Sequence, residues 1–198
     1  MPLREPRGSS REELVIKRSR FICEAQRIDD EKHARELLAR KREEHPKANH
    51  VVYAFSHGDE QNRQFGMSDD GEPRNTAGRP ALEVLRGSGV TNVLVTIVRY
   101  FGGTKLGTGG LVHAYSDGAK LALESLPTRE LVDEVEETLT LPYALLEPVK
   151  SAIEENGGRI VSESFGENVG LLLRVRRESR ERLENALRDA SRGSVGFL

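Results

Sequence analysis

Long hydrophobic runs are missing from this 198-residue sequence. No stretch approaches the roughly 20 apolar residues that a membrane-spanning helix requires, and the opening MPLREPRGSSREE lacks the apolar core of a secretory signal. We therefore expect a cytoplasmic protein without a membrane partner.

Cysteine is also scarce. The single Cys23 excludes an internal disulfide framework and a cysteine-rich zinc site, and its apolar flanks favour a buried structural thiol. The five histidines include no pair at helical i, i+4 spacing, so no metal site is assigned. For His50 and His113, a packing or surface role competes with a role as general base. Because no nucleophile elbow is present either, no catalytic residue is assigned, and we favour a protein that is not an enzyme.

A large net charge is lacking as well. Charged residues make up 31% of the chain, but the formal net charge is −2, which argues against a uniformly basic nucleic-acid binder. Any nucleic-acid surface must then be a local patch. Residues 174–192 carry an excess of arginine, from which Arg174, Arg176 and Arg177 are possible nucleic-acid contacts. The strand there presents no stacking aromatics, so a solvated helix face is the competing interpretation.

The first part of the chain mixes strand and helix patterns. Strands are expected at 13–28, 50–57, 63–68 and 92–100, and helices from Asp29 or Asp30 to Pro46, from Pro80 to Gly87, and along the face of Leu111, Tyr115, Ala119, Ala122 and Leu126. The strand at 92–100 is the most apolar, which predicts a central position covered on both faces.

The composition changes near residues 127 to 132. From 135 onward the pattern is strand, helix, strand, strand, helix and a final strand in GSVGFL, which is the βαββαβ order of a ferredoxin-like domain. We therefore predict an α+β protein with two domains, 1–127 and 135–198.

A glycine-rich stretch, VRYFGGTKLGTGGLVHAYSDGA at 98–119, lies between an apolar strand and a helix. This arrangement can direct free backbone N–H groups and the positive end of a helix dipole at an anion. The spacing matches neither a Walker loop nor a dinucleotide fingerprint, so a tight connection remains the alternative. The candidate binding residues are Arg99, Tyr100, Gly102, Gly103, Lys105, Gly107, Thr108, Gly109 and Gly110.

An acidic turn, SDDGEPRNTAGRP at 68–80, precedes the second predicted helix. Its oxygen atoms could bind Mg²⁺ or Ca²⁺, or a carboxylate pair could act as acid and base, whereas a solvated turn is the simpler interpretation. Its candidate residues are Asp69, Asp70, Gly71, Glu72, Thr76 and Gly78. If both loops lie at one end of the same sheet, the carboxylates face Arg99 and Lys105 in a charged cleft.

Four stretches together resemble the IMPACT/YigZ family in its bacterial two-domain form: KRSRFI, HPKANHVVYAF, SDDGEPRNTAGRPALEVLRGSG and the glycine-rich stretch above. The resemblance covers almost the whole chain. It implies a first domain similar to the second domain of a small-subunit ribosomal protein and to elongation-factor domain IV, followed by a ferredoxin-like domain similar to that factor's domain V. Eukaryotic members of the family regulate translation by competing for a scaffold protein that activates an initiation-factor kinase. They do so with an extra N-terminal domain that we do not expect in this protein.

Three functions are compatible with these patterns. The leading hypothesis is a non-enzymatic cytoplasmic protein that regulates translation through contacts with the ribosome, RNA or a translation-associated protein, with both loops forming one groove and no cofactor. The alternative is a phosphate-ligand-binding protein or small Mg²⁺-dependent enzyme that uses the same loops. The third is a structural adaptor in which every motif serves core packing or turns.

Overall fold

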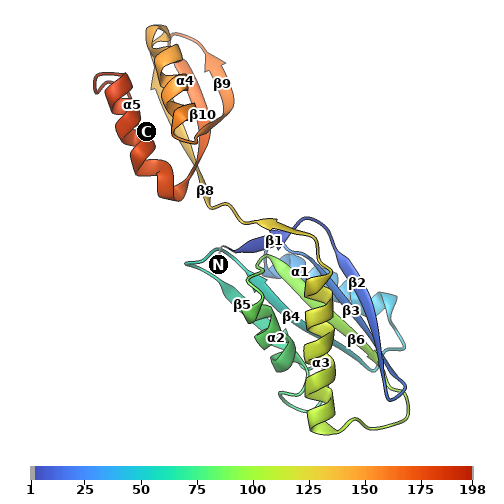
Figure 1. Ribbon diagram of the computed structural model, residues 1–198. Helices are drawn as coiled ribbons and strands as arrows, with labels where there is room; N and C mark the ends of the chain where they lie inside the picture. Colours follow the sequence, from blue (N-terminus) through green and yellow to red (C-terminus); the bar gives the residue numbers. More distant parts are fainter. Residues whose placement is uncertain (1–2, 198) are drawn as a thin grey trace. The chain divides into compact units, whose positions relative to one another are not determined.

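The computed structural model describes residues 3–197, and the chain divides after Leu131 into two compact units (Figure 1). Both units combine helices with antiparallel sheet, which confirms the predicted α+β class. Within residues 3–197, no helix is both long enough and apolar enough to cross a membrane.

The first unit is built on a five-stranded sheet in the order β2-β3-β6-β4-β5, with every neighbouring pair antiparallel. Its strands and helices are β1 (Arg4–Pro6), β2 (Ser10–Ile16), β3 (Ser19–Arg27), α1 (Glu31–Glu44), β4 (His50–His57), β5 (Gln64–Ser68), α2 (Gly78–Gly87), β6 (Val93–Tyr100), α3 (Gly107–Glu124) and β7 (Thr128–Glu130).

Helices cover both faces of this sheet (Figure 1). Helices α2 and α3 pack on one face around the fully buried Tyr115, whereas α1 packs on the other with Leu37 and Leu38. Seven of the eight residues of β6 are buried, so the prediction of a central strand covered on both faces is confirmed. Helix α1 begins after Asp30, whose carboxylate accepts the backbone N–H of His33, as its capping role predicted.

Two short strands join the ends of the first unit. Strand β1 pairs with β7, and the buried carboxylate of Glu5 binds both Arg27 and Arg129. Residues 128–131 therefore belong to the first unit, beyond the predicted domain end at 127.

The glycine-rich stretch differs from the expected single loop. Helix α3 already begins at Gly107, so Gly107, Gly109 and Gly110 form its first turn, and only residues 101–106 connect it to β6. The sequence indicated a later helix start, because glycine disfavours a helix interior, although the first turn of a helix tolerates it.

The second unit contains β8 (Glu134–Leu141), α4 (Leu146–Glu155), β9 (Arg159–Phe165), β10 (Val169–Arg176) and α5 (Arg180–Ala190), in the predicted order. Its sheet has the order β8-β10-β9, and alternate residues of β10 are buried against the helices. The predicted final strand is not formed in the described residues. Instead, Ser191 holds this segment at the end of α5 by accepting the N–H of Val195 at 2.9 Å, and Val195 packs into the core.

Candidate functional site

Four chain segments meet at one end of the five-stranded sheet, and we call this end the loop edge. The segments are the β2–β3 turn (17–18), the α1–β4 connection (45–49), the β5–α2 connection (69–77) and the β6–α3 connection (101–106).

The strand registers and loop contacts place these segments together. Tyr100 at the end of β6 pairs with Arg20 at the start of β3, and Arg99 pairs with His50 at the start of β4. The N–H of Phe101 donates to Asn49 Oδ1 at 2.8 Å. The antiparallel arrangement thus brings connections from distant parts of the sequence to a common edge.

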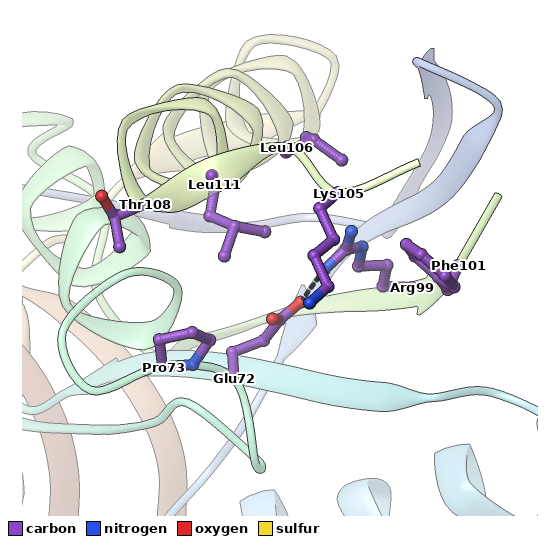
Figure 2. Close-up of a pocket in the computed structure, with 9 residues that line it drawn as sticks. Glu72, Pro73, Arg99, Phe101, Lys105, Leu106, Thr108 and Leu111 are labelled. Carbon is purple, nitrogen blue, oxygen red and sulfur yellow. Dashed lines mark hydrogen bonds and ion pairs between the residues drawn. The ribbon is translucent and has the colours of Figure 1, made fainter. Parts of the chain in front are cut away.

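A pocket of about 360 Å³ opens at the loop edge (Figure 2). It is lined by Glu72, Pro73, Arg99, Phe101, Lys105, Leu106, Gly107, Thr108 and Leu111. The acidic turn and the glycine-rich stretch therefore do meet, as the cleft hypothesis required, but only some of the predicted residues face the space between them.

The pocket contains a buried ion pair. Arg99 Nη1 donates to Glu72 Oε1 at 2.5 Å, and the Tyr115 hydroxyl donates to the same oxygen at 2.8 Å. All three side chains are buried, and burial together with the Glu72 carboxylate raises the pKa of Tyr115 far above its usual range. Removal of either partner from a buried pair is costly, and a carboxylate with two donors on one oxygen is poorly placed to act as a general base.

The Arg99 guanidinium ties several elements to this pair. Its Nη2 donates to Ser19 Oγ at 3.3 Å, and it lies 5.4 Å from the ring centre of Phe21 and 5.7 Å from that of Phe101. Its buried Nε has no hydrogen-bond partner among the described residues. Arg99 is thus a structural centre of the edge rather than a free cation.

Lys105 is the exposed cation of the pocket. Figure 2 shows its side chain extending from the β6–α3 connection in the direction of the Glu72–Arg99 pair. Among the ion pairs of residues 3–197, Glu72 is paired with Arg99 and lies 3.8 Å from His50 Nε2, whereas Lys105 forms none. The first turn of α3, which includes Thr108, begins beside it without a side-chain cap, so the rim of the pocket is electropositive.

The two aspartates of the acidic turn hold backbone groups. Asp69 accepts the N–H groups of Asn75, Ala77 and Gly78 at 2.8 to 3.1 Å, and thereby caps α2. Asp70 accepts the N–H of Val51 at 2.6 Å and pairs with Arg42. The carboxylate oxygens of both aspartates are engaged in these contacts. Both residues were predicted to line the groove, but neither lines the pocket.

The other predicted residues of the acidic turn shape the backbone. The buried Thr76 donates its hydroxyl to the Pro73 carbonyl at 2.6 Å. Gly71 has a φ of 86°, and a Cβ at Gly78 would lie 2.6 Å from the backbone of Ser68. His50 contacts the Asp70 carbonyl at 2.8 Å, which fits its packing role.

Tyr100 lies on the opposite face of β6 from Arg99, as the alternation of a strand requires, and contacts His45 Nδ1 at 2.8 Å. The predicted groove therefore loses Tyr100. Of the glycines, Gly102 packs so closely on Arg18 that a Cβ would lie 2.0 Å from its carbonyl carbon. Gly103 has a φ of 84°, and Gly110 packs against Leu106.

Four pocket residues were missed from the sequence: Pro73, Phe101, Leu106 and Leu111. Leu111 was assigned to the core face of the helix, which it also serves. The sequence did contain a signal for Phe101. A large aromatic residue directly before a glycine pair belongs to a loop rather than to a strand or helix, so it has no core position to fill and is a candidate for binding.

The three arginines of the second unit that were predicted as possible nucleic-acid contacts are paired with acids. Arg174 donates twice to Glu136 at 2.6 and 2.8 Å, and Arg177 donates to Asp133 at 2.8 Å. Arg176 lies 3.7 Å from Glu178. The local arginine excess therefore does not create unneutralised cations at these three positions.

Among residues 3–197, no group of three or more histidine, cysteine, aspartate or glutamate side chains could hold a metal ion. Cys23 is buried, and burial raises the pKa of its thiol to about 12, so it remains protonated and unreactive at neutral pH.

Comparison with known proteins gives matches over both units. The model of the Impact N-terminal domain matches residues 17–123, and a domain of unknown function (DUF1949) matches 139–194. The chain is 39% identical to IMPACT family member YigZ of Escherichia coli, over 92% of this chain and 90% of that protein. It is 43% identical to an IMPACT family member of Thermus thermophilus, over 65% of this chain and 68% of that one. A solved structure described as a hypothetical protein matches at 36% identity with a TM-score of 0.71, over 100% of this chain and 97% of that one.

Proposed function

The chain belongs to the IMPACT family, and from this premise we propose that it is a non-enzymatic cytoplasmic binding protein that regulates translation. In this proposal the loop edge of the first unit contacts the ribosome, RNA or a translation-associated protein. No cofactor takes part in the contact.

The observation that carries the proposal is the character of the pocket. Its carboxylate, Glu72, is neutralised by Arg99, while its rim presents Lys105 and the uncapped start of α3. A surface of this kind attracts an anionic partner, because helix N-termini and free cations both favour negative charge. The family resemblance supplies the link to translation, which the pocket by itself does not address.

The test is cosedimentation of the full chain with ribosomes, using a charge reversal at Lys105. We expect Lys105→Glu to reduce the bound fraction at least tenfold. The substitution removes a cation that attracts phosphate and puts in its place a carboxylate that repels it. Lys120→Glu is the matched control, since Lys120 is an exposed lysine on α3 outside the loop edge, with its Nζ 3.8 Å from Glu124 Oε1. Equal binding by the wild type and both variants would contradict the loop edge as the contact.

A second candidate function is binding of a small phosphorylated compound, with or without Mg²⁺. The pocket volume of about 360 Å³ favours it, because pockets for small ligands start near 300 Å³. A thermal-shift panel of nucleotides and phosphorylated metabolites tests this alternative, since a ligand at about 100 times its dissociation constant adds roughly 2.7 kcal/mol to the free energy of unfolding. The absence of a shift with every compound would remove it.

A further inference from the structure

The loop edge gathers positive charge that the rest of the molecule does not neutralise. Its four segments carry five exposed cations, for which the described part of the chain offers no carboxylate within ion-pair distance: Lys17, Arg18, Lys47, Arg74 and Lys105. The acids on the same segments are Asp69, Asp70 and Glu72. Asp70 and Glu72 form ion pairs with Arg42 and Arg99, whereas Asp69 accepts only backbone N–H groups, so the five cations outnumber the one unpaired carboxylate. A chain with a net charge of −2 thus has one edge that is locally basic.

The β2–β3 turn is unusual for its geometry. Lys17 and Arg18 have φ values of 47° and 68°, in the left-handed region where a two-residue hairpin strongly prefers Asn-Gly. Two long cationic side chains in this conformation reduce stability without filling a core position. Functional sites are one place where such departures from local preference are expected.

An exposed aromatic ring lies on one of the same four segments. Phe101 is 46% exposed, although Asn49 fixes its backbone and the Arg99 guanidinium lies 5.7 Å from its ring centre. The ring is therefore positioned at the pocket but has one side open to solvent. Single-stranded nucleic acids bind to surfaces that combine a cationic track with aromatic rings on which bases stack.

Gly109 is a third departure from local rules. It lies in the first turn of α3, its φ is not positive, and a Cβ would meet nothing within 4 Å. Neither backbone conformation nor packing within the unit requires glycine there, although glycine costs helix stability. A partner backbone that approaches the helix closely would require it.

We propose that the loop edge binds single-stranded RNA, with the phosphates on its five cations and a base stacked on Phe101. This rests on the proposed function and specifies its partner. A duplex fits less well, because its bases are already stacked and the ring at Phe101 would have no free base to contact.

The test measures fluorescence anisotropy of a labelled uridine decamer RNA with the full chain. We expect Phe101→Ala to weaken binding about 5- to 150-fold, which is the usual range for loss of one stacked base. Phe101→Tyr should retain binding within about threefold, since its ring stacks equally well. Phe165→Ala is the matched control, because Phe165 is a 63% exposed phenylalanine of the second unit and should leave affinity unchanged.

Thermal unfolding of each variant verifies that the fold is intact. Binding of the decamer that is insensitive to Phe101→Ala, or equally tight binding of the same sequence as a duplex, would overturn the RNA proposal. Failure to bind the decamer, combined with ribosome sedimentation that still depends on Lys105, would also overturn it and indicate an acidic protein surface as the partner. In that case the proposed function would stand. If the protein bound neither the decamer nor ribosomes, both the RNA proposal and the proposed function would be overturned.

Discussion

The two units both display basic residues, but they use them differently. In the second unit Arg174 and Arg177 each bind an acid on a neighbouring strand or connection, whereas at the loop edge the exposed cations have no such partner in the described chain. An arginine count along the sequence made the second unit a possible nucleic-acid surface, with a solvated helix face as the competing interpretation. The comparison teaches that a binding surface depends on unneutralised charge, which only the tertiary structure determines.

The ion pairs of the two units also differ in burial. The Glu72 and Arg99 side chains are 4% and 6% exposed, whereas those of Glu136 and Arg174 are 50% and 43% exposed. Loss of one partner of a buried pair leaves an uncompensated charge in a medium that solvates it poorly. The same loss at the surface is compensated by water.

The largest expected effect follows from this difference. We predict that Glu72→Ala lowers the free energy of unfolding of the first unit by about 3–5 kcal/mol, because it leaves Arg99 and the Tyr115 hydroxyl without their acceptor. Glu136→Ala should lower that of the second unit by less than about 1 kcal/mol. Denaturant unfolding of the full chain measures both, and similar losses for the two variants would refute the distinction.

Two glycines of the glycine-rich stretch should respond in opposite directions. Gly102→Ala is expected to reduce stability by about 1–3 kcal/mol, because the new Cβ meets the Arg18 backbone. Gly109→Ala should raise it by about 0.4–1 kcal/mol, since the methyl group enters open space on a helix. Chemical denaturation measures the change in the free energy of unfolding for each variant. A loss of stability in Gly109→Ala would show that α3 needs this glycine for its own fold.

The units should also differ in their response to acid. Burial, followed by the charge of Lys41, lowers the pKa of His45, so the folded first unit disfavours the protonated ring. Because the unfolded chain takes up this proton below about pH 6.5, the stability of the first unit should fall as the pH decreases through that value. Residues 132–198 contain no histidine, so the stability of the second unit should stay constant over the same pH range.

Thermal unfolding between pH 8 and pH 5.5 measures this difference. His45→Gln keeps a hydrogen-bonding partner for the Tyr100 hydroxyl and should flatten the profile of the first unit. A wild type and a His45→Gln variant with equal slopes would show that His45 is not responsible.

Much of the fold could be predicted from the sequence because its signals are local. The apolar run of β6, the Asp30 cap of α1 and the alternation of β10 each specify an element without reference to the rest of the chain. The prediction of a final strand was wrong. Hydrogen bonds to the end of α5 engage the backbone of that segment, and no periodicity in the sequence indicates this.

The site was predicted only in part. Glu72, Arg99 and Lys105 were brought together as expected, but Asp69 was assigned to the groove because an acidic turn and a helix cap look alike in sequence. Lys17 and Lys47 were missed, since strand registers between distant parts of the chain bring their segments to the same edge as Phe101. Unneutralised charge is a property of neighbours, and neighbours across a sheet cannot be counted along a sequence.

The most direct measurement is the salt dependence of RNA binding for two double variants. Lys17→Asn plus Arg18→Asn removes two loop-edge cations with a residue that tolerates their left-handed backbone, and Arg174→Gln plus Arg177→Gln removes two paired arginines. For single strands, each lost phosphate contact makes the slope of log K against log salt shallower by about 0.7. The loop-edge variant should therefore lose up to about 1.4 units of slope while the second-unit variant matches the wild type. The reverse outcome would contradict the assignment of the contact to the first unit.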